Sequence, residues 1–289
     1  MTPDNGKIFN RPLYRLRRNR AAAGWAAHDF LKHEAALRLV ERMQDMAREF
    51  PLSLDLGCHH GEFAAAVAGK DGIKTLIQCD AAQNMLRGVA GITCVSDEEF
   101  LPFAENSFDL VVSALSLHHV NDLPGTLIQI QRCLKPDGLF LAILPGAHSF
   151  KELRASIAGA SAEHDFALTP RVSPFVEVRD AGALLMRAGF ALPVVDSEVI
   201  TAEYENILSL MKDMRGMGES SVLLEQRRGF TPRTQIAAME SYYRRHFALP
   251  DGALPVTIEF ITLTGWKPHA SQQKPLARGS GKVSLKQVL

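Results

Sequence analysis

Short apolar runs alternate with helical segments through the first half of the chain, and this alternation limits the fold more than any other feature. The run 108–115 is almost continuously apolar, as in a strand that is buried on both faces of a parallel sheet. Strands that alternate with helices pair in parallel through right-handed crossovers. The sequence therefore predicts an α/β fold with a seven-stranded, doubly wound, Rossmann-like sheet. Its strands are expected at 53–56, 75–79, 91–95, 108–115, 139–144, 194–199 and 256–263.

Helices are expected between the strands and in a segment inserted before the last strand. Asn121 or Asp122 is placed to cap a helix that carries Pro124 in its first turn, and Gly189 is placed to end another. Residues 135–138, Lys-Pro-Asp-Gly, predict a turn before the fifth strand. The helices are expected at 21–47, 61–68, 123–134, 180–188, 205–214 and 233–246.

A chain of 289 residues can bury the core of one large α/β domain without disulfides or metal. Its four cysteines lie far apart and form no Cys-x-x-Cys pair, which indicates thiols of a reducing compartment. We expect four parts along the chain. They are a helical segment at 1–50, a ligand-binding core at 51–202, a helical insertion or cap at 203–248, and the last strand with an extended tail at 249–289.

The balance of charge limits the class of partner that the protein can bind, and the targeting signals bear on its compartment. Lys plus Arg and Asp plus Glu each number 32, and this balance argues against a nucleic-acid-binding protein. No membrane span or apolar signal core stands out, so a cytoplasmic location is expected. The arginine-rich stretch 11–20 is interpreted as a solvated segment leading into a helix, in preference to an arm for anionic lipid, RNA or an acidic partner.

The turn after the first strand, Leu-Asp-Leu-Gly-Cys-His-His-Gly at 54–61, is the first candidate binding feature. Gly57 and Gly61 let the backbone approach a ligand, and the following helix offers free N–H groups to a carboxylate. Ligands of open α/β sheets bind beyond the carboxyl ends of the strands, where the strand order reverses. The turn lacks the Gly-x-Gly-x-x-Gly pattern that a dehydrogenase would show.

Carboxylates also follow the second and third strands. Asp80 can accept hydrogen bonds from both hydroxyls of a ribose, and the alternative is that it caps a helix over 81–87. Asp97 could accept a hydrogen bond from an adenine amino group that lies between apolar side chains, whereas a capped loop is the alternative. With the turn at 54–61, these positions predict a nucleoside-binding edge.

Five segments occur here in the order found in class I S-adenosylmethionine (SAM)-dependent methyltransferases: LDLGCHHG, Asp80, SDEEFLPF, FDLVVSALSLHH and LKPDGLF. The chain resembles that superfamily, type 11 in particular, which implies that SAM is bound and that S-adenosylhomocysteine is the product. His59 stands where the superfamily usually has a middle glycine, and its imidazole is expected to crowd the amino-acid end of the cofactor. The resemblance implies cofactor contacts from Asp55, Gly57, Cys58, Gly61, Asp80, Ala81, Met85, Asp97, Glu98, Ala114 and Leu115.

A narrower resemblance covers nearly the whole chain. The segments IFNR, DFLKHEAA, DEEFLPF, SLHHVNDLPGTL, LLMRAGF, LMKDMRGMGESS and GWKPHASQQKPLARGSG resemble the mitochondrial complex I assembly factors known as arginine hydroxylases, with their bacterial relatives. This resemblance implies SAM binding and hydroxylation of an arginine in an iron–sulfur subunit of respiratory complex I. It also implies peripheral contact with the membrane face where complex I is built. Relatives usually carry His-Trp where this chain has His118 and His119.

His118 and His119 follow the fourth strand, beside the expected methyl position, and are the candidate catalytic residues. Histidine titrates near neutral pH and can act as a general base, although one of the pair could instead bond a backbone carbonyl. Hydroxylation would need an oxidant, often iron held by two histidines and one carboxylate. His59, His60, His118, His119 and His148 are expected at one end of the sheet, but without a His-x-Asp pair no metal ligand is assigned.

Two other functions remain open from the sequence. A non-catalytic assembly chaperone would bind SAM for shape and use the methionine-rich run 211–217 to contact its partner. A carrier-protein or small-molecule O-methyltransferase is suggested by the Leu-Pro-Phe and Lys-Pro-Asp-Gly segments, which the malonyl carrier-protein enzymes share. That match is expected to stop at the first half of the chain.

Overall fold

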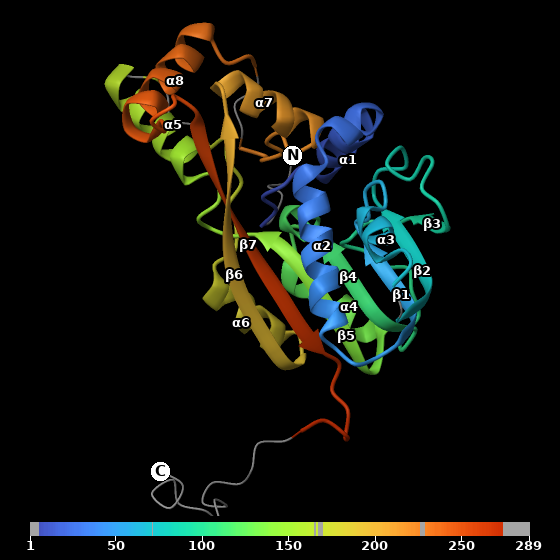
Figure 1. Ribbon diagram of the computed structural model, residues 1–289. Helices are drawn as coiled ribbons and strands as arrows, with labels where there is room; N and C mark the ends of the chain where they lie inside the picture. Colours follow the sequence, from blue (N-terminus) through green and yellow to red (C-terminus); the bar gives the residue numbers. More distant parts are fainter. Residues whose placement is uncertain (1–5, 71, 165, 167–169, 226–228, 274–289) are drawn as a thin grey trace, which may run out of the picture.

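A seven-stranded mixed sheet forms the centre of the protein. The computed structural model describes residues 6–70, 72–164, 166, 170–225 and 229–273. The strand order is β3-β2-β1-β4-β5-β7-β6, and only β7 runs antiparallel to its neighbours. The predicted doubly wound α/β fold is therefore confirmed (Figure 1). The strands are β1 Phe50–Leu56, β2 Ile73–Asp80, β3 Ile92–Val95, β4 Phe108–Ala114, β5 Leu134–Pro145, β6 Ala191–Tyr204 and β7 Leu254–Trp266.

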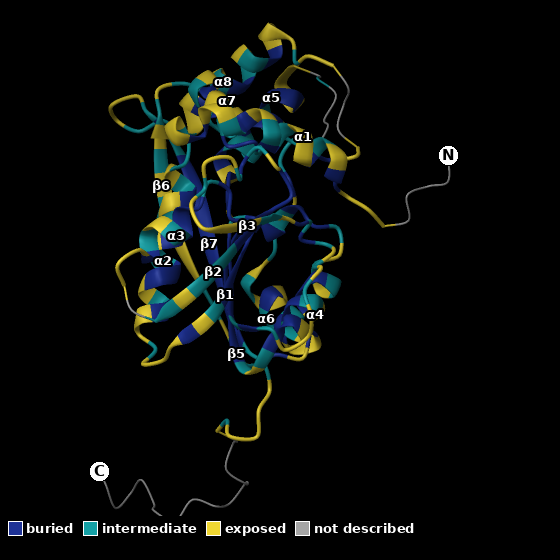
Figure 2. Cartoon of the chain, turned by 90° about the vertical axis from the view of Figure 1, so that its right-hand side faces the viewer, coloured by how far each residue is buried: buried dark blue, intermediate teal, exposed yellow. Residues whose placement is uncertain are grey.

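Helices cover both faces of the sheet, so its central strands are apolar on both sides. Helices α2 (Phe30–Gln44) and α3 (Glu62–Val67) lie on one face, and α4 (Leu123–Cys133) and α6 (Val178–Arg187) on the other (Figure 1). Val112 of β4 packs in the core beneath α2, while Val111 packs in the core beneath α4 and α6. This two-sided burial explains the continuous apolar run, and Figure 2 shows it as buried strands between the helices.

A second group of helices lies beyond the carboxyl ends of the parallel strands. It comprises α5 (Lys151–His164), α7 (Ile207–Gly216) and α8 (Arg233–Phe247), and the upper ends of β6 and β7 reach it (Figure 1). Ile157 of α5 and Met239 of α8 share one apolar cluster with Ile207. The predicted helices at 205–214 and 233–246 are confirmed, whereas α5 was not predicted.

Strands β6 and β7 are longer than the sequence indicated. The predicted strand 194–199 stopped where polar residues begin to alternate with apolar ones. In the structure Ile200, Ala202 and Tyr204 pack against the core on one side of the strand, so alternation continues the strand instead of ending it. The extension carries the sheet up to the second group of helices.

The Lys-Pro-Asp-Gly segment belongs to β5, so the prediction of a separate turn is wrong. The Asp137 N–H donates to the carbonyl of Lys267, and the Lys267 N–H donates to the carbonyl of Gly138. Asp137 has φ of 63°, and the pairing of β4 with β5 is irregular between Phe108 and Leu110. The segment is thus a kink within a paired strand, held by the backbone that follows β7.

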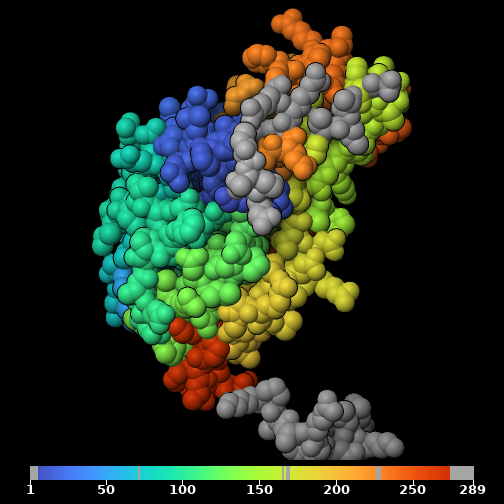
Figure 3. Space-filling view, turned by 180° about the vertical axis from the view of Figure 1, so that it is seen from behind, coloured from blue at the N-terminus to red at the C-terminus, as the bar shows by residue number. Residues whose placement is uncertain are grey.

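The N-terminal region contains a helix that the sequence did not reveal. The expected helix 21–47 is divided into a 3₁₀ segment, η1 (Ala22–Ala27), and α2, while α1 (Arg11–Ala21) precedes both. Asn10 caps α1 by accepting a hydrogen bond from the Leu13 N–H. Figure 3 shows the blue N-terminal segment packed against the body of the molecule. The interpretation of 11–20 as a solvated segment is wrong, because α1 buries part of its length.

The tail was expected to be extended beyond Trp266, and residues 274–289 of it lie outside the described residues. Residues 267–273 follow β7 without forming a further helix or strand. Among the helices of the described residues, none combines the length and the apolar character needed to cross a membrane.

The contact between α8 and β7 can be tested at one hydroxyl. The buried Tyr243 donates from its hydroxyl to the carbonyl of Pro255 at 2.6 Å. We expect Tyr243→Phe to lower the free energy of unfolding by about 1–2 kcal/mol, because the buried carbonyl loses its partner. Chemical denaturation measures this change. The half-buried neighbour provides the control, since Tyr242→Phe should cost less than about 0.5 kcal/mol. Equal losses for the two variants would contradict the assignment.

Candidate functional site

The candidate site lies where the strand order reverses, at the carboxyl ends of β1 and β4. A cavity of about 310 Å³ opens there, and its walls include His59, Leu115, His118, His119, Phe150 and Glu219. Residues of α7 and of the segment after it also line the cavity. The cavity therefore occupies the crevice in which sheets of this topology bind their ligands.

The glycine turn is shaped by the protein's own packing. Gly57 and Gly61 have φ of 73° and 86°, and an added Cβ would overlap Ser116 at the first and approach the Gln78 amide oxygen at the second. His59 has φ of 54°, so histidine is tolerated in the left-handed conformation here. Its ring lies 4.7 Å from that of Trp25, between centroids, and its Nδ1 lies 2.8 Å from the Gly57 carbonyl. His59 thus forms part of the cavity wall.

Asp80, the residue expected to bind ribose, is fully buried and already engaged. Its Oδ2 accepts hydrogen bonds from Arg18 of α1 at 2.5 Å and from the His59 N–H at 3.1 Å. Its Oδ1 accepts from the Ala82 N–H at 2.8 Å. Residues 81–87 form turns, so the alternative of a helix cap is wrong. In this conformation Arg18 lies where the ribose was expected.

The acidic residues after β3 are held by the same helix. Arg11 forms ion pairs with both Asp97 and Glu98, and Arg15 pairs with Asp97 at 3.1 Å. The fully buried Glu98 also accepts a hydrogen bond from Ser116 at 2.7 Å. The carboxylates assigned to the adenosyl group are thus brought together, with arginines of α1 as their partners.

The other residues assigned to the cofactor surround this region. Cys58, Ala81 and Ala114 are buried, and Met85 packs with Trp25 beneath α1. Leu115 has φ of 46° and lines the cavity.

Asp55 and Lys32 are buried beneath the turn. The Lys32 ammonium donates to the carbonyls of Gly57 and Ala114 at 2.7 and 2.6 Å. Neither carboxylate oxygen of Asp55 has a hydrogen-bond partner among the described residues. Burial raises the pKa of Asp55 to about 7, against the opposing charge of Lys32. Burial also lowers the pKa of Lys32.

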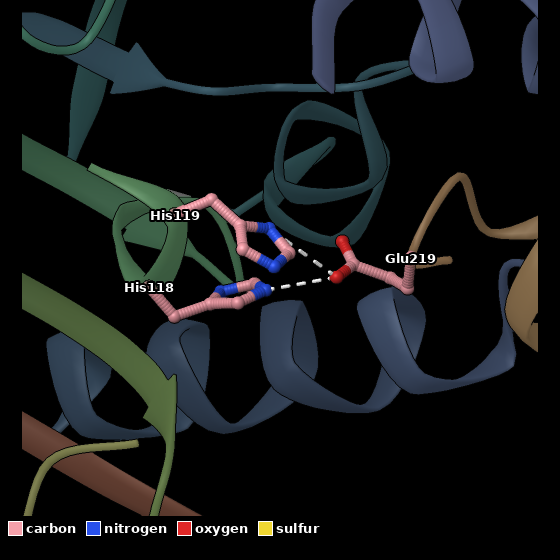
Figure 4. Close-up of side chains that lie close together, drawn as sticks. All are labelled: His118, His119 and Glu219. Atoms are coloured by element: carbon pink, nitrogen blue, oxygen red, sulfur yellow. Dashed lines mark hydrogen bonds and ion pairs between the residues drawn. The ribbon is translucent and has the colours of Figure 1, made fainter. Parts of the chain in front are cut away.

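His118 and His119 meet a third residue that the sequence did not single out, Glu219 (Figure 4). The two histidines lie on a 3₁₀ turn, η2 (Leu117–His119), which directly follows β4. Glu219 Oε2 lies 3.0 Å from His118 Nε2 and 3.5 Å from His119 Nδ1. His119 Nε2 is 3.3 Å from the Ser173 hydroxyl. The rings thus face side chains, whereas the sequence left a backbone carbonyl open as a partner.

A helix terminus carries Glu219 to the histidines. Gly218, with φ of 74°, ends α7, and the N–H groups of Gly218 and Glu219 donate to the carbonyls of Arg215 and Met214. This is the Schellman arrangement, in which a left-handed residue turns the chain away from the helix. Gly218, which follows the helical run, is the sequence signal that could have predicted the helix end beside Glu219.

The pKa values of His119 and Glu219 are shifted far from their ordinary values. Burial and the neighbouring His118 lower the pKa of His119 to about 3, which keeps its ring neutral. Burial opposes ionisation of Glu219, but His118 and His119 outweigh it and lower its pKa to about 2. Of the five histidines expected at this end, only His118 and His119 belong to a potential metal-binding group in the described part of the chain.

Comparison with known proteins agrees with the fold. Residues 54–142 match the family model of a methyltransferase domain. The human protein named arginine-hydroxylase NDUFAF5, mitochondrial, is 41% identical over 98% of this chain and 84% of its own. A malonyl-(acyl-carrier protein) O-methyltransferase of Methylovorus sp. (strain MP688) is 33% identical over 90% of this chain and 91% of its own. Phospholethanolamine N-methyltransferase 2 of Haemonchus contortus, solved with S-adenosylhomocysteine, has a TM-score of 0.55 at 17% identity, covering 89% of this chain and 60% of its own.

The fold and these similarities define a methyltransferase-like enzyme of the class I superfamily. The chain belongs to the family of the NDUFAF5 arginine hydroxylases. The expectation that the carrier-protein methyltransferase match stops at the first half is wrong, since the Methylovorus alignment covers 90% of the chain. The expected cytoplasmic location is also contradicted, because the human relative is named as mitochondrial. That expectation rested on a missing leader pattern, which says nothing of the compartment.

The ion pair between α1 and β2 predicts a measurable coupling. Arg18 and Asp80 are both fully buried, so breaking the pair leaves a charge without its partner. We expect Arg18→Met to lower the free energy of unfolding by about 3–5 kcal/mol. The double variant Arg18→Met/Asp80→Asn should cost less than the two single variants together. Chemical denaturation checks both, with the exposed Arg20→Met as control. A loss in Arg18→Met no larger than in the control would overturn this interpretation.

The raised pKa of Asp55 predicts how stability depends on pH. The folded protein holds the Asp55 proton up to a pKa of about 7, whereas the unfolded chain releases it near the ordinary value of 3.8. The stabilisation of the folded state that comes from the raised Asp55 pKa is fully present below the unfolded pKa. It is lost as pH rises through the folded pKa. Relative to Asp55→Asn, the wild type should lose roughly 2–3 kcal/mol of unfolding free energy from about pH 5 to about pH 8. Urea denaturation of both proteins, with exposed Asp45→Asn as control, gives the difference. Parallel pH profiles for wild type and Asp55→Asn would refute the raised pKa.

Proposed function

We propose that this enzyme hydroxylates an arginine side chain of a protein substrate and binds SAM at the carboxyl edge of β1, β2 and β4. The observation that carries the proposal is the near full-length similarity to the human arginine hydroxylase, which extends through the segment that holds Glu219. That segment contributes Glu219 to the wall of the same cavity that the two histidines line. The similarity thus covers the histidines and the glutamate of the proposed reaction site.

The residues present fit SAM in type and position. Asp80 ends β2, Asp97 and Glu98 follow β3, and Asp55 has two buried oxygens that lack hydrogen-bond partners within the described residues. Carboxylates at these strand ends can accept hydrogen bonds from a ribose and from amino groups. Because Arg18 occupies Asp80, binding in this mode requires α1 to shift. SAM would supply a methyl group bound to a sulfonium when present.

The cavity suits a guanidinium on an aliphatic stem. Trp25, Phe150, Phe175 and Phe260 contribute aromatic surface to its walls. A guanidinium stacks favourably on such faces. The protein shows one instance itself, since the Arg154 guanidinium carbon lies 5.3 Å from the centroid of the Phe175 ring. At about 310 Å³ the cavity is near the lower limit of small-ligand pockets, so it fits one side chain better than a folded surface.

Hydroxylation sets a requirement that SAM does not meet. Replacing a hydrogen of the arginine by a hydroxyl consumes one dioxygen, two electrons and two protons, and releases one water. The proposal therefore includes dioxygen and a two-electron reductant as co-substrates. In line with the family resemblance, we propose an iron–sulfur subunit of respiratory complex I as the protein that carries the arginine. The parts at 1–50 and 203–248 would then cover the reacting side chain.

Methyl transfer is the second candidate, and one observation favours it. The Methylovorus carrier-protein methyltransferase aligns over 90% of this chain, so its likeness extends beyond the nucleotide-binding half. A carboxylate nucleophile needs no base, and the protein would mainly align it with the methyl group. In that case His118 and His119 would have no proton to remove. Hydroxylation is preferred because the identity to the human arginine hydroxylase is higher, at 41% against 33%.

Mass spectrometry of the substrate separates these functions. The complex I iron–sulfur subunit should be isolated from cells with and without the gene and digested to peptides. We expect one arginine to carry an additional oxygen only when the gene is present. An added methyl group would instead support the transferase. Identical masses with the partner still retained on the purified enzyme would support a non-catalytic chaperone.

A further inference from the structure

The cluster of His118, His119 and Glu219 joins two distant parts of the chain at one point of the cavity wall. Its three potential ligand atoms all lie within 4.8 Å of one another. The histidines come from the turn after β4, and the glutamate comes from the end of α7 (Figure 4). All three side chains line the cavity, so a ligand held between them would face the open space.

Two nitrogens in this cluster lack hydrogen-bond partners. His118 Nδ1 and His119 Nδ1 are buried and make no hydrogen bond among the described residues. His119 is only 2% exposed, and its Nδ1 points toward Glu219 at 3.5 Å (Figure 4). Buried polar atoms without partners are uncommon in proteins and call for a specific explanation. A cation held by His119 Nδ1, His118 Nε2 and the Glu219 carboxylate would supply the missing interaction of His119 Nδ1.

Among the described residues, no lysine or arginine forms an ion-pair contact with the carboxylate of the cluster. The buried arginines of α1 are paired with other residues, Arg18 with Asp80 and Arg11 with Glu98. Within the described residues, the ion-pair contacts of Glu219 are with His118 and His119 alone. A half-buried carboxylate whose ion-pair partners are two imidazoles, in place of a lysine or an arginine, has the composition of a metal site more than of a structural salt bridge.

We propose that His118, His119 and Glu219 bind one divalent transition-metal ion, with iron(II) as the physiological class. Two imidazoles and one carboxylate are the donor set of non-haem iron oxygenases, and they leave coordination positions open. Here the open positions would face the cavity, where the substrate arginine is expected. The use of the metal to bind dioxygen rests on the proposed hydroxylation, whereas metal binding rests on these three side chains.

Cobalt(II) provides a direct probe, because its visible absorption depends on its ligands. The full chain, purified metal-free, is titrated anaerobically with Co²⁺, and the titration is repeated with Fe²⁺ by calorimetry. We expect one ion per chain, with imidazole nitrogens in the cobalt X-ray absorption spectrum. An all-oxygen coordination shell, or no binding, would refute the site.

Variants then locate the ion. His118→Ala, His119→Ala and Glu219→Gln should each weaken Co²⁺ binding by at least about tenfold. The exposed His33→Ala and Glu41→Gln are the matched controls and should bind like the wild type. Circular dichroism and thermal melting identify any variant that fails to fold, and Glu219→Gln preserves the size of the side chain. Unchanged affinity in the three cluster variants would overturn the proposal.

The same proteins separate this inference from the proposed function. Tight Co²⁺ binding that depends on the cluster, without arginine hydroxylation by the iron-loaded enzyme, would support the metal site and contradict the function. Hydroxylation that persists in folded His118→Ala and His119→Ala would support the function and contradict the metal's role in it.

Discussion

The buried ion pair between Arg18 and Asp80 fixes how the N-terminal region meets the rest of the protein. Both side chains are completely buried, and removal of either leaves a charge in the interior. The pair holds α1 across the carboxyl edge of the sheet, where β1 and β2 end. Its position also brings Arg11 to the acidic residues after β3. The helix that completes the fold is therefore the same helix that covers the edge at which we propose that SAM binds.

If SAM binds as we propose, this arrangement links its binding to a shift of α1. Arg18 pairs with Asp80 Oδ2, and Arg11 pairs with Asp97 and Glu98, so three of the carboxylates expected to contact the nucleoside already have guanidinium partners. The cavity beside them is already open and is lined by His118, His119 and Glu219. The protein thus has two neighbouring regions, a covered one where we propose that SAM binds and an open one where we propose that a metal ion and the substrate arginine meet. Under the proposed function, this division would let a methyltransferase-like fold carry out a hydroxylation beside a SAM site.

The sequence was sufficient for the sheet because two-sided burial leaves a clear pattern. The continuous apolar run of β4 and the glycine turn after β1 reflect local requirements of packing and backbone conformation. Helix α1 was missed because its arginines resemble a solvated stretch, and only the distant partners Asp80 and Glu98 make their burial favourable. Long-range pairing of this kind has no local signature.

Local sequence patterns predicted some residues of the site and missed others that depend on long-range contacts. His118 and His119 could be proposed from their place after β4, since strand ends of a doubly wound sheet meet at one edge. Glu219 could not, because it lies 101 residues after His118 and reaches the histidines only through the end of α7 and the turn at Gly218. The backbone kink at Asp137 was missed because its partner, Lys267, lies beyond β7.

A single isotope experiment tests the central claim most directly. The purified, iron-supplied enzyme is incubated with the arginine-containing subunit, a reductant, ¹⁸O-labelled dioxygen and SAM labelled with ¹³C in its methyl group. Arginine hydroxylation predicts that ¹⁸O, and no ¹³C, enters one arginine of the substrate. Transfer of the ¹³C-methyl group to the substrate, without ¹⁸O, would contradict it.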